Sequence, residues 1–68
     1  MSILKTELKR YRQERDLKQE ELGQMVGVRR ETIMRLEKGL YNPSLKLAMD
    51  LAKVFRVSVE TLFQFEDD

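Results

Sequence analysis

The segment from residue 29 to residue 38 concentrates side chains that can recognise an anionic partner or the edge of a nucleobase. Its basic side chains are those of Arg29, Arg30, Arg35 and Lys38. A guanidinium group offers a planar fork of donors that fits two adjacent acceptors, such as O6 and N7 of guanine. In the same segment, Glu31 can accept a hydrogen bond from cytosine N4, and Met34 can pack on a thymine methyl group. These residue types favour contact with base pairs, G·C pairs among them.

Each of these side chains also has a simpler interpretation. Arg30 and Arg35 could contact phosphates alone, and Met34 could be an isolated apolar residue on the surface. Glu31 could pair with Arg35, which follows it by one helical turn. We expect base contacts from four residues, and these alternatives stay open: Arg30, Glu31, Met34 and Arg35.

Several other chemistries lack the residues they need. The 68 residues include no cysteine and no histidine, so disulfides and imidazole ligands or bases are excluded. The chain has no glycine-rich phosphate loop, and its carboxylates are scattered over predicted helix surfaces. We therefore expect a protein that is not an enzyme and that binds no metal, cofactor or small-molecule ligand.

The charges are unevenly distributed, although the net charge is only +1. Residues 1–40 carry ten Lys or Arg against seven Asp or Glu, a balance of +3, whereas residues 41–68 carry three against five, a balance of −2. Such unevenness also arises by chance on solvated surfaces. A basic surface, where one exists, is expected within the first forty residues.

The length allows one domain, covering residues 1–68. A core of this size supplies only about 3 to 5 kcal/mol of stability, and in the absence of disulfides or a metal we expect self-association to supplement it. The N-terminal residues lack the apolar region of a signal peptide, and no apolar run reaches the length of a membrane span. A soluble, cytoplasmic protein without membrane contact is therefore expected.

Hydrophobic spacing and the positions of glycine and proline predict an all-α fold of five short helices. The first begins near Thr6, or at Ser2, because Leu4, Leu8 and Tyr11 follow a helical stripe. The expected ranges are 6–15 or 2–15, 19–26, 30–38, 42–55 with an Asn-Pro start, and a fifth helix after Ser58. Residues 63–66 alternate apolar and polar, which favours a short strand beside Ile3 and Leu4. Further inward positions are expected at Leu22, Met25, Val26, Leu45, Ala48, Leu51, Ala52 and Phe55.

Two short helices joined by a tight glycine turn, with a small residue four positions before that glycine, are typical of a helix-turn-helix. The pattern here comprises Gly23, Gly27, Ile33 and Leu36. The small residue lets another helix approach closely, the glycine accepts the turn, and the two aliphatic residues pin the second helix to the core. The remaining face of that helix can then enter a DNA major groove, which is about 12 Å wide.

Five fragments in order give the chain its resemblance to the Xre/Cro phage-repressor family, over about residues 6–65. This resemblance implies a five-helix, lambda-repressor-like DNA-binding domain whose second motif helix is the recognition helix. The fragments are Leu17-Lys18-Gln19-Glu20-Glu21-Leu22, Gly27-Val28, Thr32-Ile33, Leu36-Glu37-Lys38-Gly39 and Tyr41-Asn42-Pro43-Ser44-Leu45.

The resemblance also implies roles for individual residues. Gln19 would contact a DNA phosphate, and Arg12 would form a buried ion pair with Glu37. That pair also makes physical sense, because Glu37 adjoins the inward Leu36 and a half-buried carboxylate there needs a cation. The residues expected to contact phosphates are Gln19, Arg29, Lys38 and Asn42.

The sequence departs from the family pattern at three places. Lys18 and Arg29 stand where the family usually has Ser or Thr caps, and each change loses a cap worth about 1 kcal/mol while adding a cation near the expected phosphates. Glu31 stands where the family often has Gln. The operator sequence of a known family member therefore cannot be transferred to this chain.

The expected function is sequence-specific binding of double-stranded DNA by a homodimeric transcriptional regulator. Two copies would associate through the fifth helix and the tail, so that two recognition helices lie about 34 Å apart on a palindromic operator and repress a promoter by covering it. The expected interface residues are Leu62, Phe63 and Phe65. The alternative is a protein-binding module, such as an antitoxin or adaptor, which the excess of cations on the recognition helix disfavours.

Overall fold

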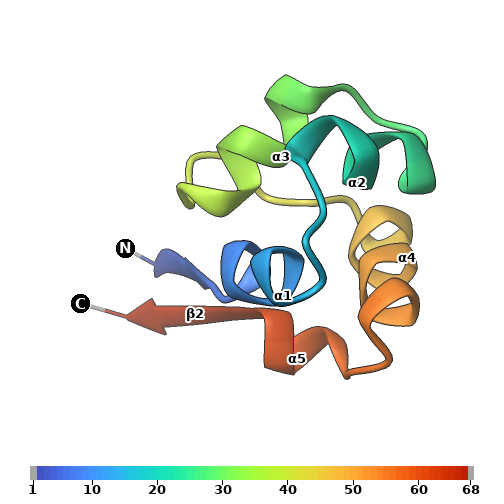
Figure 1. Cartoon of the computed structure of the whole chain (residues 1–68). Coiled ribbons are helices and arrows are strands. Elements are labelled where there is room, and N and C mark those ends of the chain that lie inside the picture. The colour runs from blue at the N-terminus through green and yellow to red at the C-terminus, as the bar shows by residue number, and fades with distance from the viewer. Residues whose placement is uncertain (1, 68) are drawn as a thin grey trace.

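The computed structural model describes residues 2–67 of the chain, with the side chains of residues 4–66. Five helices and two strands make up this part (Figure 1), which confirms the predicted all-α fold with a short terminal strand pair. In chain order they are β1 (Ser2–Thr6), α1 (Leu8–Glu14), α2 (Gln19–Val26), α3 (Arg30–Glu37), α4 (Leu45–Phe55), α5 (Val59–Leu62) and β2 (Phe63–Asp67).

The two strands form an antiparallel sheet that brings both ends of the described chain together (Figure 1). Leu4 pairs with Phe65, and Thr6 pairs with Phe63. The predicted strand is confirmed, but the predicted helix start at Thr6 or Ser2 is wrong. Leu4 is buried, as its spacing indicated, but it belongs to a strand, because pairing with the distant tail outweighs the local helical pattern. The threonine hydroxyl instead accepts a hydrogen bond from the backbone N–H of Leu8 at 3.1 Å, where α1 begins.

Every helix contributes to one core. Six aliphatic side chains in it are completely buried: Leu8, Leu22, Ile33, Leu36, Leu51 and Leu62. Met25 and Leu45, which were predicted to face inward, are instead exposed. No helix within residues 2–67 is both long enough and apolar enough to cross a membrane.

The fourth helix begins later than predicted. Ser44, and not Asn42, is its cap, and the serine hydroxyl accepts a hydrogen bond from the backbone N–H of Leu47 at 3.1 Å. Leu45 therefore opens the helix on its solvent side and remains 74% exposed. Asn42 and Pro43 belong to the loop between α3 and α4, which leaves the asparagine side chain on a loop surface.

Candidate nucleic-acid interface

Helices α2 and α3 lie together at the top of Figure 1, joined by a three-residue turn. Gly27 adopts a left-handed conformation with φ 75°, as its place after α2 predicted. A Cβ atom on Gly23 would lie 2.6 Å from the carbonyl oxygen of Val28, so a larger residue there would displace the turn. The neighbour that requires glycine is therefore the backbone of the turn and not, as predicted, another helix.

Helix α3 is held by one face and presents the other to solvent. Ile33 and Leu36 are completely buried, as predicted. Met34 is half-buried at the edge of the outward face. Five charged side chains at the ends and on the outer face of α3 are exposed: Arg29, Arg30, Glu31, Arg35 and Lys38.

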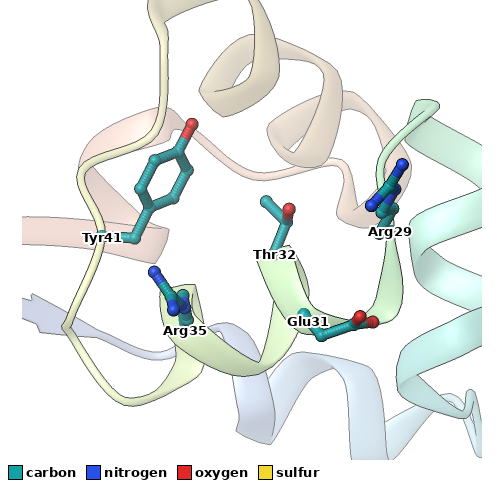
Figure 2. Close-up of a pocket in the computed structure, with 5 residues that line it drawn as sticks. All are labelled: Arg29, Glu31, Thr32, Arg35 and Tyr41. Carbon is teal, nitrogen blue, oxygen red and sulfur yellow. The ribbon is translucent and has the colours of Figure 1, made fainter.

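The exposed charged side chains of α3 do not pair with one another. Among the side chains of residues 4–66, none of the five forms an ion pair, and the alternative pairing of Glu31 with Arg35 does not occur. Figure 2 shows the two side chains pointing away from each other, Glu31 toward the N-terminal end of α3. Four cations and one carboxylate thus remain available to an external partner.

A buried ion pair fixes the other side of α3 to α1. Nε of Arg12 donates to Glu37 Oε2 at 2.5 Å, and Nη2 donates to Oε1 at 3.1 Å. The third nitrogen, Nη1, donates to the carbonyl oxygen of Leu17 at 2.8 Å. The Glu37 side chain is only 3% exposed, and its hydrogen bonds raise the pKa of Arg12 above the ordinary value. The ion pair that the family resemblance implied is present, and it fixes the inward side of α3 to α1.

Gln19 joins this network from the start of α2. Its Nε2 donates to Glu37 Oε1 at 3.1 Å, which leaves one amide hydrogen and the amide oxygen for another partner. At the same helix end, the backbone N–H of Lys18 donates to Glu21 Oε1 at 2.8 Å. Neither Lys18 nor Arg29 caps its helix with its side chain, so both cations project from helix starts.

An open hollow of about 420 Å³ lies along α3, and Figure 2 shows the five residues that line it. Arg29, Thr32 and Arg35 follow one another at three-residue spacing along the helix, and Tyr41 closes the far side from the next loop. Sequence reasoning assigned no role to Thr32 or Tyr41. For Tyr41 the available signal was its position shortly after α3, in a loop bounded by Gly39 and Pro43.

Asn42 does not line this hollow, although it neighbours Tyr41 in sequence. It lines a second, largely apolar hollow between the loop, α4 and β2. The other residues of that hollow are Leu4, Pro43, Leu45, Ala48, Val59, Phe63 and Phe65. The structure therefore does not bring Asn42 together with the outward arginines of α3.

Two of the three predicted interface residues belong to the protein's own core. Leu62 is completely buried and offers no surface to a second copy, whereas Phe63 is 7% exposed and its exposed part lines the second hollow, so its contact with a second copy stays a prediction. Their side chains turn inward because the α5–β2 junction closes over the core. Phe65 remains 59% exposed beside the second hollow.

Comparison with known proteins gives consistent matches along the chain. A family model described as helix-turn-helix matches residues 8–62. An uncharacterized HTH-type transcriptional regulator of Archaeoglobus fulgidus is 51% identical over 65 residues, covering 96% of this chain and 92% of that protein. A regulator of the same description from Methanocaldococcus jannaschii is 51% identical over 65 residues, covering 96% and 98%. The transcriptional repressor RstR of cryptic phage CTXphi, from Vibrio cholerae, is 35% identical over 60 residues, covering 88% and 54%.

Proposed function

Because this chain belongs to the helix-turn-helix family of transcriptional regulators, we propose that it is a repressor that binds a palindromic operator in double-stranded DNA as a homodimer. The observation that carries the proposal is the outward face of α3, with four exposed cations that have no internal partner among the described residues. A single helix fits the major groove, which is about 12 Å wide. Similarity to the repressor RstR supports repression as the output.

In this proposal, the residues of α3 divide the work of recognition. Arg30 and Arg35 read guanine through paired donors, Glu31 accepts from cytosine N4, and Met34 packs on a thymine methyl group. The half-buried position of Met34 suits a short apolar contact at the rim of the groove. A half-site that contains G·C pairs follows from this assignment.

Phosphate contacts are proposed for three residues around the recognition helix: Gln19, Arg29 and Lys38. The phosphate contact predicted for Asn42 is not carried forward, because Asn42 lines the second hollow. Gln19 is well prepared for this role, since its bond to Glu37 fixes the amide while one N–H stays available. Lys18, at the same helix end, adds a further cation close to the expected DNA backbone.

The decisive experiment first selects the sequences that the protein binds from a pool of random DNA duplexes. It then measures the affinity of the protein for the selected sequence and for random duplex at several salt concentrations. Phosphate contacts predict a steep fall in affinity with salt. Arg35→Ala should lose about 1 to 3 kcal/mol on the selected site and relax one base preference, whereas Gln19→Ala should weaken all sequences alike. Lys53→Ala, an equal change of charge on α4, is the control. Absence of salt-dependent DNA binding would leave the antitoxin or adaptor alternative.

For the homodimer, we propose that the second hollow and Phe65 form the contact between copies. A two-fold interface must be self-complementary, and here an exposed aromatic side chain adjoins an apolar hollow. Phe65→Ser should shift sedimentation toward the monomer and weaken operator binding. Met25→Ser is the matched control, because Met25 is 56% exposed but lies on α2, away from this hollow. A monomeric wild type at tens of micromolar would refute the dimer.

A further inference from the structure

The carboxylate of Glu37 joins three helices at one point. It belongs to the last residue of α3, and it accepts hydrogen bonds from Arg12 on α1 and from Gln19 at the start of α2. Its Oε1 atom is shared, because Nη2 of Arg12 and Nε2 of Gln19 both lie 3.1 Å from it. The Glu37 side chain is only 3% exposed, so little water competes with these donors. The carboxylate therefore holds a side chain of α2 against the end of α3.

Arg12 also holds the chain that leads into α2. Its Nη1 atom donates to the carbonyl oxygen of Leu17 at 2.8 Å, and the backbone N–H of Leu17 donates to the carbonyl oxygen of Arg12 at 3.2 Å. Gln19 follows two residues later, as the first residue of α2. One arginine thus fixes the backbone before Gln19 directly, and it fixes the Gln19 side chain through Glu37.

The chemistry of a carboxylate determines which end of the Gln19 amide turns toward it. An ionised carboxylate only accepts hydrogen bonds, so it attracts the amide nitrogen and repels the amide oxygen. Gln19 is half-buried, and only one of its two N–H groups donates to Glu37. The nitrogen can therefore bridge two anions, the buried carboxylate and a phosphate outside. The guanidinium of Arg12 neutralises the inner anion, which reduces its repulsion of the outer one.

From this arrangement we infer that Glu37 is a positioning residue for Gln19, because its carboxylate orders the amide as a phosphate donor before DNA arrives. The inference rests on the proposed function and deepens it, since it gives the buried ion pair a role in DNA affinity as well as in stability. Ordering a flexible side chain on binding costs about two- to tenfold in affinity. Glu37 removes that cost in advance, while α3 remains free to contact bases.

The test uses Arg12→Met/Glu37→Met, which removes the carboxylate without leaving a buried charge. Its affinity for the selected operator and for random duplex should fall by the same factor, about two- to tenfold, because a phosphate contact carries no sequence information. Gln19→Ala should cost less affinity in this background than in the wild type, by that same factor. The matched control is Glu7→Met/Arg10→Met, which removes an exposed ion pair of 2.9 Å and should leave affinity unchanged.

A second readout locates the effect at one phosphate. Methylphosphonate substitution removes the charge of one phosphate at a time. It should weaken binding by the wild type at the phosphate that Gln19 contacts, and it should have much less effect there on Gln19→Ala. Arg12→Met/Glu37→Met should show a reduced effect at that position alone. A reduced effect at several phosphates, or a relaxed base preference, would indicate a general loosening of the domain and would overturn the inference.

The wild type alone supplies a measurement that does not depend on the folding of any variant. In the protein without DNA, NMR relaxation of the side-chain amides should show Gln19 to be rigid and Gln24, an exposed residue of the same helix, to be mobile. Equal mobility of the two amides would overturn the inference, as would unchanged affinity in Arg12→Met/Glu37→Met. If Gln19→Ala binds DNA as the wild type does, the inference fails while the proposed function stands. A wild type without salt-dependent DNA binding would overturn both.

Discussion

Replacing Arg12 by methionine tests whether the buried ion pair governs the stability of the recognition helix. The substitution removes three hydrogen bonds and leaves the Glu37 carboxylate, 3% exposed, with only the amide of Gln19. Removing one partner of a buried pair costs about 3 to 5 kcal/mol. Because a core of this size supplies a similar total, about 3 to 5 kcal/mol, the free energy of unfolding of the variant should fall to near zero, so that about half of the molecules are unfolded at 25 °C.

The double variant Arg12→Met/Glu37→Met should recover most of this loss. Neither charge is then buried alone, and apolar replacement of a buried pair is often neutral. The carbonyl of Leu17 and the amide of Gln19 each lose one partner, which costs about 1 kcal/mol apiece. A net loss of about 1 to 2 kcal/mol is expected, well below that of Arg12→Met alone.

Thermal and urea unfolding followed by circular dichroism at one fixed protein concentration measures these differences, since dimerisation makes stability depend on concentration. Each kcal/mol corresponds to about 4 to 8 °C in Tm for a domain of this size. Arg10→Met is the control on the same helix: Arg10 pairs with Glu7 at 2.9 Å on the surface, so its removal should leave Tm nearly unchanged. The single variant Glu37→Met completes the comparison. If the double variant lost as much stability as Arg12→Met and Glu37→Met lose when their separate losses are added, the two side chains would be uncoupled and the reasoning refuted.

Three further outcomes follow from the structure. Gly23→Ala should lower the free energy of unfolding by about 1 to 3 kcal/mol, because its Cβ would lie 2.6 Å from the backbone carbonyl oxygen of Val28. Gly27→Ala has open space around its Cβ and should lose only about 1 to 2 kcal/mol, from the strain of a left-handed backbone. The midpoints of urea unfolding compare the two variants. Arg29→Ser should raise stability by about 1 kcal/mol through a helix cap and lower the salt slope of DNA binding by about 1. The hydrogen bond to Glu66 raises the pKa of Lys5 above its ordinary value of 10.5. The Lys5–Glu66 pair therefore stabilises the fold fully below pH 10.5, and this stabilisation is lost as the pH rises through the raised pKa. The Tm of Lys5→Met should lack the part of the alkaline decrease that the wild type shows.

Helices α2 and α3 could be predicted from local signals. The range of α2, Gln19–Val26, was predicted correctly, and α3 differs only at Lys38, its final residue. Gly27, with φ 75°, follows α2, and Gly39, with φ 71°, follows α3. A glycine after a helix indicates a left-handed helix end from the local sequence alone. Ile33 and Leu36 were recognised for the same reason, since their three-residue spacing defines one helix face.

The errors arose where distant residues decide the outcome. Leu4 has helical spacing from Leu8, and only its pairing with Phe65, far along the chain, makes it part of a strand. Phe63 and Phe65 alternate with Gln64 and Glu66 and so share one face of the strand, but the sequence does not say that the core reaches only Phe63, next to α5, and leaves Phe65 exposed. Tyr41 was assigned no role because the hollow that it lines forms only when the loop after α3 is folded.

The pairing of β1 with β2 joins the first described strand to the last, so we expect the loop after α3 to gain its full support only late in synthesis. Gly39, beside the recognition helix, rests on Leu4, and Leu4 gains its strand partner only when residue 65 is in place. A nascent chain therefore carries α2 and α3 before it carries the support beneath their exit loop. A product truncated before residue 63 would retain every arginine of α3 but would lack the strand that pairs with Leu4 beside Gly39, so we expect its α3 and the following loop to be less stable than in the full chain.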